Sequence, residues 1–286
     1  VDDAATLARI ACPIVAFGIG YNLLLECLRA DMVQSVLPET SQKLAALGAV
    51  SNLIGVRDRR LQNMFGEAFA KPVSLVGDPA LFLEPLMSGP LPQSLKPGAW
   101  RIGLNFALHG PLSAAIFQAH FNDYVQFLKR IERQWPITFF YFIHCDTERI
   151  AIAMLREHGV KLHVVDLPPG ELLSAYGQMD FAICQMLHSS ILATNAGVPS
   201  VNIGYDLKNI SFYELLGLPE LSLAHHELTQ ERLWKMLAEL IRRKCEIAAQ
   251  LEQRKAVLRA ATDNFISEIE HMLNDVTCSC REPRDQ

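Results

Sequence analysis

The feature that most constrains the fold is a repeated alternation of short apolar runs with helix-like segments in the second half of the chain. The five apolar runs are 101–106, 137–143, 161–165, 180–184 and 200–204. The helix-like segments that follow them lie near 113–134, 147–158, 169–176, 188–196 and 209–216. Buried strands that alternate with helices predict a parallel sheet covered by helices on both faces.

A shorter alternation precedes this one. Strand-like runs at 13–17, 50–56 and 73–76 are separated by helical patterns near 22–35, 40–47 and just after the run R-D-R-R. The chain is therefore expected to be an α/β protein with two Rossmann-like lobes, in a GT-B-like arrangement of parallel sheets with helices on both faces. Ligands of such sheets bind at the carboxyl ends of the strands.

Proline density marks the division between the lobes. Four prolines fall within residues 84–99, and they exclude a continuous helix or a central strand there. We expect an N-terminal lobe over 1–85, a linker over 86–99 and a C-terminal lobe over 100–286. The tract from 228 to 274 predicts one or two terminal helices of that lobe. Because Val1 is no initiator Met and the first residues resemble mid-domain sequence, we expect upstream sequence to be missing.

Composition narrows the class of protein. The net charge is −5, and the 26 Lys and Arg residues form no basic stripe, which gives little support to a nucleic-acid partner. Seven cysteines without a pairing pattern indicate a reducing compartment. No run reaches the roughly 18 to 20 apolar residues of a membrane helix, and no signal peptide is recognised. We expect a soluble, cytoplasmic protein.

The residues best placed for chemistry follow the last two strands of the alternation. His188 and Ser189 begin a helix directly after the run 180–184, where helix N–H groups and the helix dipole favour anions. A histidine there can also exchange a proton near neutral pH. Tyr205 and Lys208 follow the next strand and are expected on the same rim. An imidazole packed against the sheet and a solvated lysine remain open alternatives.

Two further histidines follow strands: His109 comes after 101–106, and His144 comes after 137–143. Both are expected at the carboxyl edge, as secondary candidates for substrate binding. The pair His225-His226 looks exposed, and a metal site would need further ligands at defined spacing. We therefore expect no metal site.

Several segments together resemble one family. Residues 187–218, LHSSILATNAGVPSVNIGYDLKNISFYELLGL, are similar to the C-terminal signature of polysaccharide pyruvyltransferases. Three earlier segments resemble N-terminal elements of that family, in the family's order: PIVAFGIGYN, IGVRDRRLQNMF and VSLVGDPALFL. The resemblance runs from about residue 12 to residue 218.

The resemblance implies a transferase that moves the pyruvyl group of phosphoenolpyruvate onto two sugar hydroxyls as a cyclic ketal. Phosphoenolpyruvate is then the donor substrate, no separate cofactor is needed, and the acceptor is a sugar or lipid-linked oligosaccharide. It also implies a place in exopolysaccharide biosynthesis for the cell envelope. His188 would be the catalytic acid and base, and Arg57 and Lys208 would bind anionic groups. Contact with the membrane periphery and the oligomeric state stay open.

One position departs from the family pattern. Met186 lies where the family has an arginine two residues before the histidine, and a thioether cannot bind a carboxylate or phosphate as a guanidinium does. Arg59, Arg60 and Arg101 are candidate substitutes. Two other functions remain open: a GT-B glycosyltransferase that uses a nucleotide sugar, and a non-catalytic relative that binds a glycan.

Overall fold

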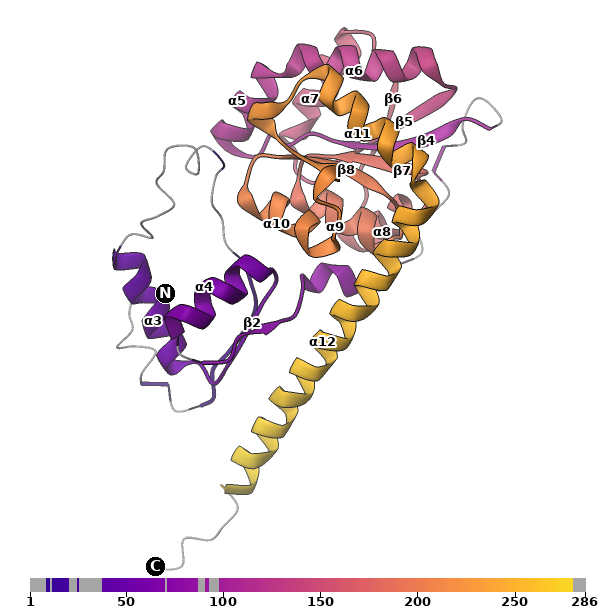
Figure 1. Ribbon diagram of the computed structural model, residues 1–286. Coiled ribbons are helices and arrows are strands. Elements are labelled where there is room, and N and C mark those ends of the chain that lie inside the picture. Colours follow the sequence, from indigo (N-terminus) through magenta and orange to yellow (C-terminus); the bar gives the residue numbers. More distant parts are fainter. Residues whose placement is uncertain are drawn as a thin grey trace, which may run out of the picture. The chain divides into compact units, whose positions relative to one another are not determined.

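The computed structural model describes residues 9–10, 12–20, 25, 38–69, 71–86, 91–92 and 98–279. The chain divides into two compact units, each of which contains a parallel sheet and helices (Figure 1). The first unit is made by residues 1–79 together with 256–286, and the second by residues 80–255. The predicted α/β class is confirmed. No described helix combines the length and the hydropathy needed to span a membrane.

The first unit has a three-stranded parallel sheet in the order β1-β2-β3. Its elements are β1 (Val15–Ile19), α3 (Pro38–Val50), β2 (Leu53–Val56), α4 (Arg59–Phe69) and β3 (Ser74–Leu75). Ile54 and Val56 pack into one cluster with Leu61 and Phe65 of α4. Side chains alternate along a strand, so Gly55 faces the opposite side of the sheet. The predicted helix at 22–35 lies outside the described residues, except for Leu25.

The opposite side of this sheet meets the last helix, α12 (Lys244–Ser279). A Cβ atom on Gly55 would lie 3.1 Å from the ring of Phe265, so glycine permits this close approach. Phe265 also stacks on Phe17, with the ring centroids 5.8 Å apart, and the Thr262 hydroxyl donates to the Val76 carbonyl. The sequence assigns the whole terminal tract to the C-terminal lobe, whereas the structure places its last part in the first unit. Helical periodicity alone does not show which sheet a helix covers.

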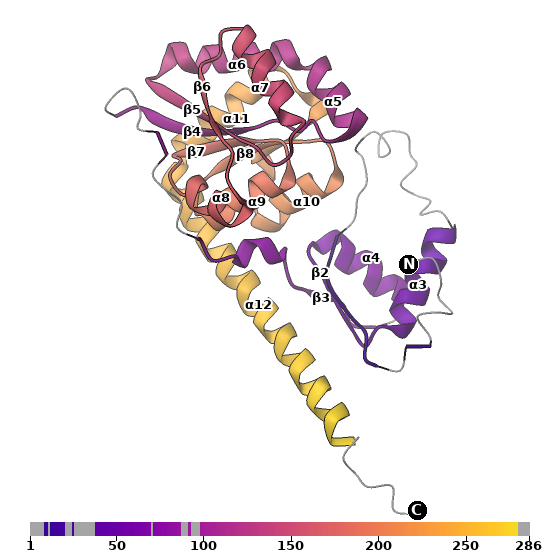
Figure 2. The ribbon, with the colours of Figure 1, turned by 180° about the vertical axis from the view of Figure 1, so that it is seen from behind.

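The second unit has a six-stranded parallel sheet in the order β6-β5-β4-β7-β8-β9. The strands are β4 (Trp100–Asn105), β5 (Ile137–Phe142), β6 (Leu162–Val165), β7 (Phe181–Cys184), β8 (Ser200–Gly204) and β9 (Ser222–Ala224). The helices are α5 (Gly110–Ala119), α6 (Phe121–Gln134), α7 (Glu148–Glu157), α8 (Pro169–Tyr176), α9 (Leu187–Asn195), α10 (Leu207–Leu216) and α11 (Gln230–Arg242). In Figures 1 and 2, α5, α6, α7 and α11 cover one face of this sheet, and α8, α9 and α10 cover the other.

Three details of this unit differ from the sequence prediction. The helical segment 113–134 is two helices that meet at His120. β9 adds a short edge strand that the sequence did not reveal. Of the predicted linker, Leu91 is buried in the core of this unit, and its N–H donates to the Gln178 side chain at 3.2 Å.

The strand order also locates the functional edge. From β4 the chain builds outward through β5 and β6, then returns to the other side of β4 and continues through β7, β8 and β9. The order therefore reverses between β4 and β7. In doubly wound sheets, ligands bind outside the carboxyl ends of the strands at such a reversal.

Candidate functional site

A cavity of about 470 Å³ opens at the carboxyl edge of the second unit. Its polar lining comes from the residues that follow β5 and β6 and from the start of α9: His144, Cys145, Asp146, Asp166 and His188. Ala80 and Leu83 complete one wall, and their carbonyls accept hydrogen bonds from the Asn195 side chain of α9 at 3.1 and 3.0 Å. The whole lining belongs to the second unit.

His188 lies in the first turn of α9, directly after β7. Met186 is the cap residue of this helix, and its N–H donates to the Asn105 side chain at 3.1 Å. Leu187 points into the core, whereas His188 is exposed and lines the cavity. The alternative of an imidazole packed into the interior is therefore wrong.

His144 lies in the same cavity. Its backbone N–H donates to Glu148 at 2.7 Å, and its Nε2 lies 3.0 Å from the Tyr176 hydroxyl. Burial, with a smaller contribution from the neighbouring His188, lowers the pKa of His144 to about 4. The His144 imidazole is consequently neutral at pH 7.

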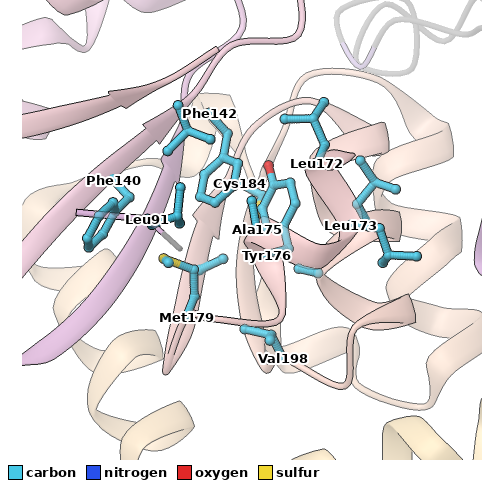
Figure 3. Packing of buried hydrophobic residues seen from close by; sticks show 14 residues of the cluster. Leu91, Phe140, Phe142, Leu172, Leu173, Ala175, Tyr176, Met179, Cys184 and Val198 are labelled. Atoms are coloured by element: carbon cyan, nitrogen blue, oxygen red, sulfur yellow. The ribbon is translucent and has the colours of Figure 1, made fainter. Parts of the chain in front are cut away.

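Ser189 is fully buried, in contrast to the neighbouring His188. Its hydroxyl lies 2.5 Å from the Tyr176 hydroxyl and donates to the Cys184 sulfur at 3.2 Å. Figure 3 shows Tyr176 beside Cys184 in the core, with its ring against Phe142, and the two ring centroids are 3.9 Å apart. The sequence places Ser189 in substrate contact, but in the structure its hydroxyl bonds to the protein interior.

A buried polar network, which was not predicted from the sequence, supports this edge. The Asn105 side chain donates to Glu148 at 3.0 Å and to the Phe142 carbonyl at 3.1 Å. Gln185 accepts from the Ala107 N–H at 2.9 Å. Burial raises the pKa of Glu148, against the opposing effect of the backbone N–H of His144. One sequence signal could have indicated this network: Asn105 and Gln185 are polar residues at the ends of apolar strand runs.

Tyr205 and Lys208 follow β8, the strand beside β7, and so lie on the same edge of the sheet as His188. The buried Asp206 caps α10 by accepting from the Lys208 N–H at 3.0 Å, and the Lys208 ammonium lies 3.8 Å from the same carboxylate. Burial raises the pKa of Tyr205. Lys208 is half-buried and outside the lining of the described cavity.

His109 also lies on this edge, since it is the cap residue of α5 after β4. Its side chain is exposed, its carbonyl accepts from the Ser113 hydroxyl at 2.6 Å, and it lies outside the lining of the described cavity. The structure thus brings His144 and His188 together in one cavity, whereas His109, Tyr205 and Lys208 lie outside its lining.

Arg57 belongs to the first unit. Its guanidinium pairs with Asp78 at 3.0 Å, and a Cβ atom on Gly20 would come within 2.2 Å of it. The last glycine of the turn after β1 therefore makes room for this side chain. Asp58 accepts from the Leu61 N–H at 2.9 Å, so its carboxylate caps the start of α4.

Of the candidate substitutes for the missing family arginine, only Arg101 belongs to the same unit as the cavity. Arg101 is the second residue of β4, at the amino edge of the sheet, and its guanidinium lies 4.8 Å from the ring centroid of Phe140. It is therefore at the end of its strand opposite to the cavity. Arg59 and Arg60 begin α4 in the first unit, where both are exposed.

The exposure of the histidine pair after β9 also differs from the prediction. His225 is buried, not exposed, and only His226 faces solvent. Among the described residues, no group of three or more His, Cys, Asp or Glu side chains is arranged to hold a metal ion.

Comparison with known proteins gives the family. The sequence profile described as polysaccharide pyruvyl transferase matches residues 4–206, a range that includes Met186 and His188. The chain belongs to this family. The family is one of transferases, and the matched range contains every predicted site residue except Lys208, which lies two positions beyond it.

Solved structures related to this pyruvyl transferase family member show its fold. A UDP-N-acetylglucosamine 2-epimerase matches with a TM-score of 0.59 and 12% identity, over 99% of this chain and 77% of that one. The UDP-forming α,α-trehalose-phosphate synthase of Burkholderia xenovorans matches with a TM-score of 0.55 and 13% identity, over 92% and 69%. The predicted GT-B-like fold is confirmed by these structures. A third structure is the Thermobaculum terrenum O-GlcNAc transferase mutant K341M, which matches with a TM-score of 0.46 and 18% identity. The match covers 77% of this protein but only 44% of the transferase.

Proposed function

We propose that this protein transfers the pyruvyl group of phosphoenolpyruvate to two hydroxyls of a sugar or glycan, forming a cyclic ketal. Family membership supports this reaction. The structural observation that carries it is the exposed His188 imidazole, which lines a cavity at the carboxyl edge of the sheet together with His144. The acceptor is a sugar or a lipid-linked oligosaccharide, and no separate cofactor takes part.

The chemistry requires a proton donor for the methylene carbon of the donor substrate, a base for the attacking hydroxyls and positive charge for the carboxylate and phosphate. We assign the proton transfers to His188. We assign the binding of the anionic groups to the first N–H groups of α9 and to the ammonium of Lys208, which follows the neighbouring strand β8.

Met186 bears directly on donor affinity, because its side chain lines the same cavity as His188. A thioether there supplies no charge to the donor. Asp146 and Asp166, which also line the cavity, are both paired with Arg149, and this pairing reduces the repulsion that their carboxylates exert on an anion. We therefore propose that the donor is bound by the N-terminus of α9 and by Lys208, with weaker affinity than an arginine at position 186 would give.

We further propose that the reaction takes place in the cytoplasm, as a step in the synthesis of exopolysaccharide for the cell envelope. Four cysteines whose side chains the structure describes, Cys12, Cys145, Cys184 and Cys245, are free thiols, which agrees with a reducing compartment.

The test is phosphate release from phosphoenolpyruvate by the full-length protein, with a panel of sugar acceptors and mass spectrometry of the product. His188→Ala should abolish release, whereas His271→Ala, which changes an exposed histidine of α12, should leave it intact. Activity retained by His188→Ala would remove this residue from the mechanism. A thermal shift with UDP- or GDP-sugars, but none with phosphoenolpyruvate, would favour a glycosyltransferase instead.

A further inference from the structure

A chain of hydrogen bonds runs from the cavity into the core of the second unit. His144 Nε2 lies 3.0 Å from the Tyr176 hydroxyl, which lies 2.5 Å from the Ser189 hydroxyl. The Ser189 hydroxyl in turn donates to the Cys184 sulfur at 3.2 Å. Tyr176, Ser189 and Cys184 are each at most 1% exposed, so water does not replace any of these partners.

The number of protons available fixes which group donates and which accepts in each of these hydrogen bonds. A hydroxyl has a single proton to donate. Ser189 gives its proton to the Cys184 sulfur, so it must accept the proton of Tyr176. Tyr176 has then no proton left for the imidazole and must accept from His144 Nε2–H.

Ionisation does not disturb this arrangement. Burial raises the pKa of Tyr176 well above its usual value and raises that of Cys184 to about 12. The phenol and the thiol therefore stay protonated at any pH at which the protein functions. His144 is consequently held as the Nε2–H tautomer, with the lone pair on Nδ1. The structure shows no hydrogen bond to Nδ1 from the described residues.

We propose that His144 is the general base of the transfer, that its Nδ1 takes a proton from an acceptor hydroxyl, and that Tyr176 and Ser189 are positioning residues that hold its tautomer. This inference rests on the proposed function. It divides the proton transfers between the two histidines of the cavity: His188 serves the methylene carbon and the second hydroxyl, and His144 serves the first hydroxyl and the phosphate.

The protons balance over one turnover. His188 gives a proton to the methylene carbon of phosphoenolpyruvate, and the first hydroxyl adds to the neighbouring carbon while its proton goes to His144 Nδ1. The second hydroxyl then displaces phosphate, breaking the carbon–oxygen bond, and its proton goes to His188. His144 returns its proton to the departing phosphate. Both imidazoles are left as they began.

The charges around His144 suit a base. The titratable groups that line the cavity with it are His188, Cys145, Asp146 and Asp166, and Tyr176 and Glu148 contact it from the interior. The low pKa of about 4, caused by burial and then by His188, keeps the imidazole unprotonated in the free protein. An anionic donor in the cavity raises this pKa and makes the imidazole a stronger base when substrate is bound.

The first experiment reads the tautomer directly, by nitrogen-15 NMR of histidine-labelled full-length protein without substrate. The wild type should show His144 as Nε2–H. In Ser189→Ala, the Tyr176 proton loses its acceptor and turns to His144, so the tautomer should change to Nδ1–H. Ser190→Ala is the matched control, because Ser190 is an equally buried neighbour whose hydroxyl accepts from Asn202 at 3.1 Å. An unchanged tautomer in Ser189→Ala would overturn the inference.

The second experiment is steady-state phosphate release. Ser189→Ala and His144→Gln should lower kcat by about 10²-fold, the usual contribution of a general base, with KM for phosphoenolpyruvate changed less than about twofold. An active wild type with unchanged kcat in His144→Gln overturns this inference alone. A wild type that releases no phosphate with any acceptor overturns the proposed function as well.

Discussion

Replacing Glu148 with glutamine tests the network under the candidate site. Glu148 is fully buried, and its two oxygens divide three donors between them. One oxygen accepts from the backbone N–H groups of His144 at 2.7 Å and Cys145 at 3.5 Å, and the other accepts from Asn105 at 3.0 Å. A glutamine has one acceptor oxygen, so its amide group must face one of these donors.

The magnitude follows from that loss. A buried donor left without an acceptor costs about 1–3 kcal/mol. We therefore expect Glu148→Gln to lower the free energy of unfolding by about 2 kcal/mol near pH 5. Glu157→Gln, which makes the same change at the exposed end of the same helix, should stay within about 0.5 kcal/mol.

The difference between wild type and Glu148→Gln should depend on pH. Burial raises the pKa of Glu148 above its usual value of 4.5, so the carboxyl ionises more readily in the unfolded chain. Its contribution to stability is complete below pH 4.5 and is lost as pH rises through the folded-state pKa. Glutamine does not titrate. The advantage of the wild type should consequently shrink from pH 5 to pH 8.

The assay is urea unfolding followed by tryptophan fluorescence. The chain has three tryptophans, Trp100, Trp135 and Trp234, and all belong to the second unit. Trp135 stacks on both of the others, with ring centroids 5.5 and 5.1 Å apart, so the signal reports this unit specifically. An advantage of the wild type that grows with pH, or no difference at either pH, would refute the reasoning.

Two further predictions concern the cavity and the first unit. Met186→Arg should lower the KM for phosphoenolpyruvate by about tenfold, because a charge-assisted hydrogen bond contributes about 1.5 kcal/mol. Steady-state phosphate release measures it against Met186→Gln, and equal KM values in the two variants would argue against a donor site beside residue 186. Phe265→Ala removes a ring that packs on Phe17 and over Gly55, and should cost about 3–5 kcal/mol. Thermal unfolding by circular dichroism tests this loss, with the exposed neighbour Ile266→Ala as control; similar losses in both would contradict the packing described.

Much of the second unit follows from its sequence. The five predicted strands are all present within one or two residues, because a strand buried on both faces is a continuous apolar run. The same reasoning placed His188, since a helix had to begin where β7 ends. β9 was not predicted because its three residues, Ser222–Ala224, are too few to form a recognisable strand pattern. The break between α5 and α6 at His120 was not predicted because apolar positions continue at helical spacing through both helices.

The environment of the site was less predictable, for a physical reason. Glu148 lies in the first turn of α7, where an acidic residue is favoured by the helix dipole and usually faces water. Only the folded chain brings Asn105 and the N–H of His144 to it. Ser189 and Tyr176 are likewise 13 residues apart, and their contact depends on how α8 and α9 pack. The type of a residue and its position at the end of a strand predict where a functional site lies. The hydrogen-bond partners of that residue can be identified only once the fold is known.

The assignment of the last part of α12 to the first unit has a consequence for biosynthesis. A ribosome makes residues 1–79 well before Phe265 and Thr262, which pack on their sheet. The second unit is complete in sequence by residue 255 and can fold while that sheet is still bare on one face. Molecular chaperones that bind exposed apolar surface on nascent chains would therefore meet the first-translated unit for longer than the second.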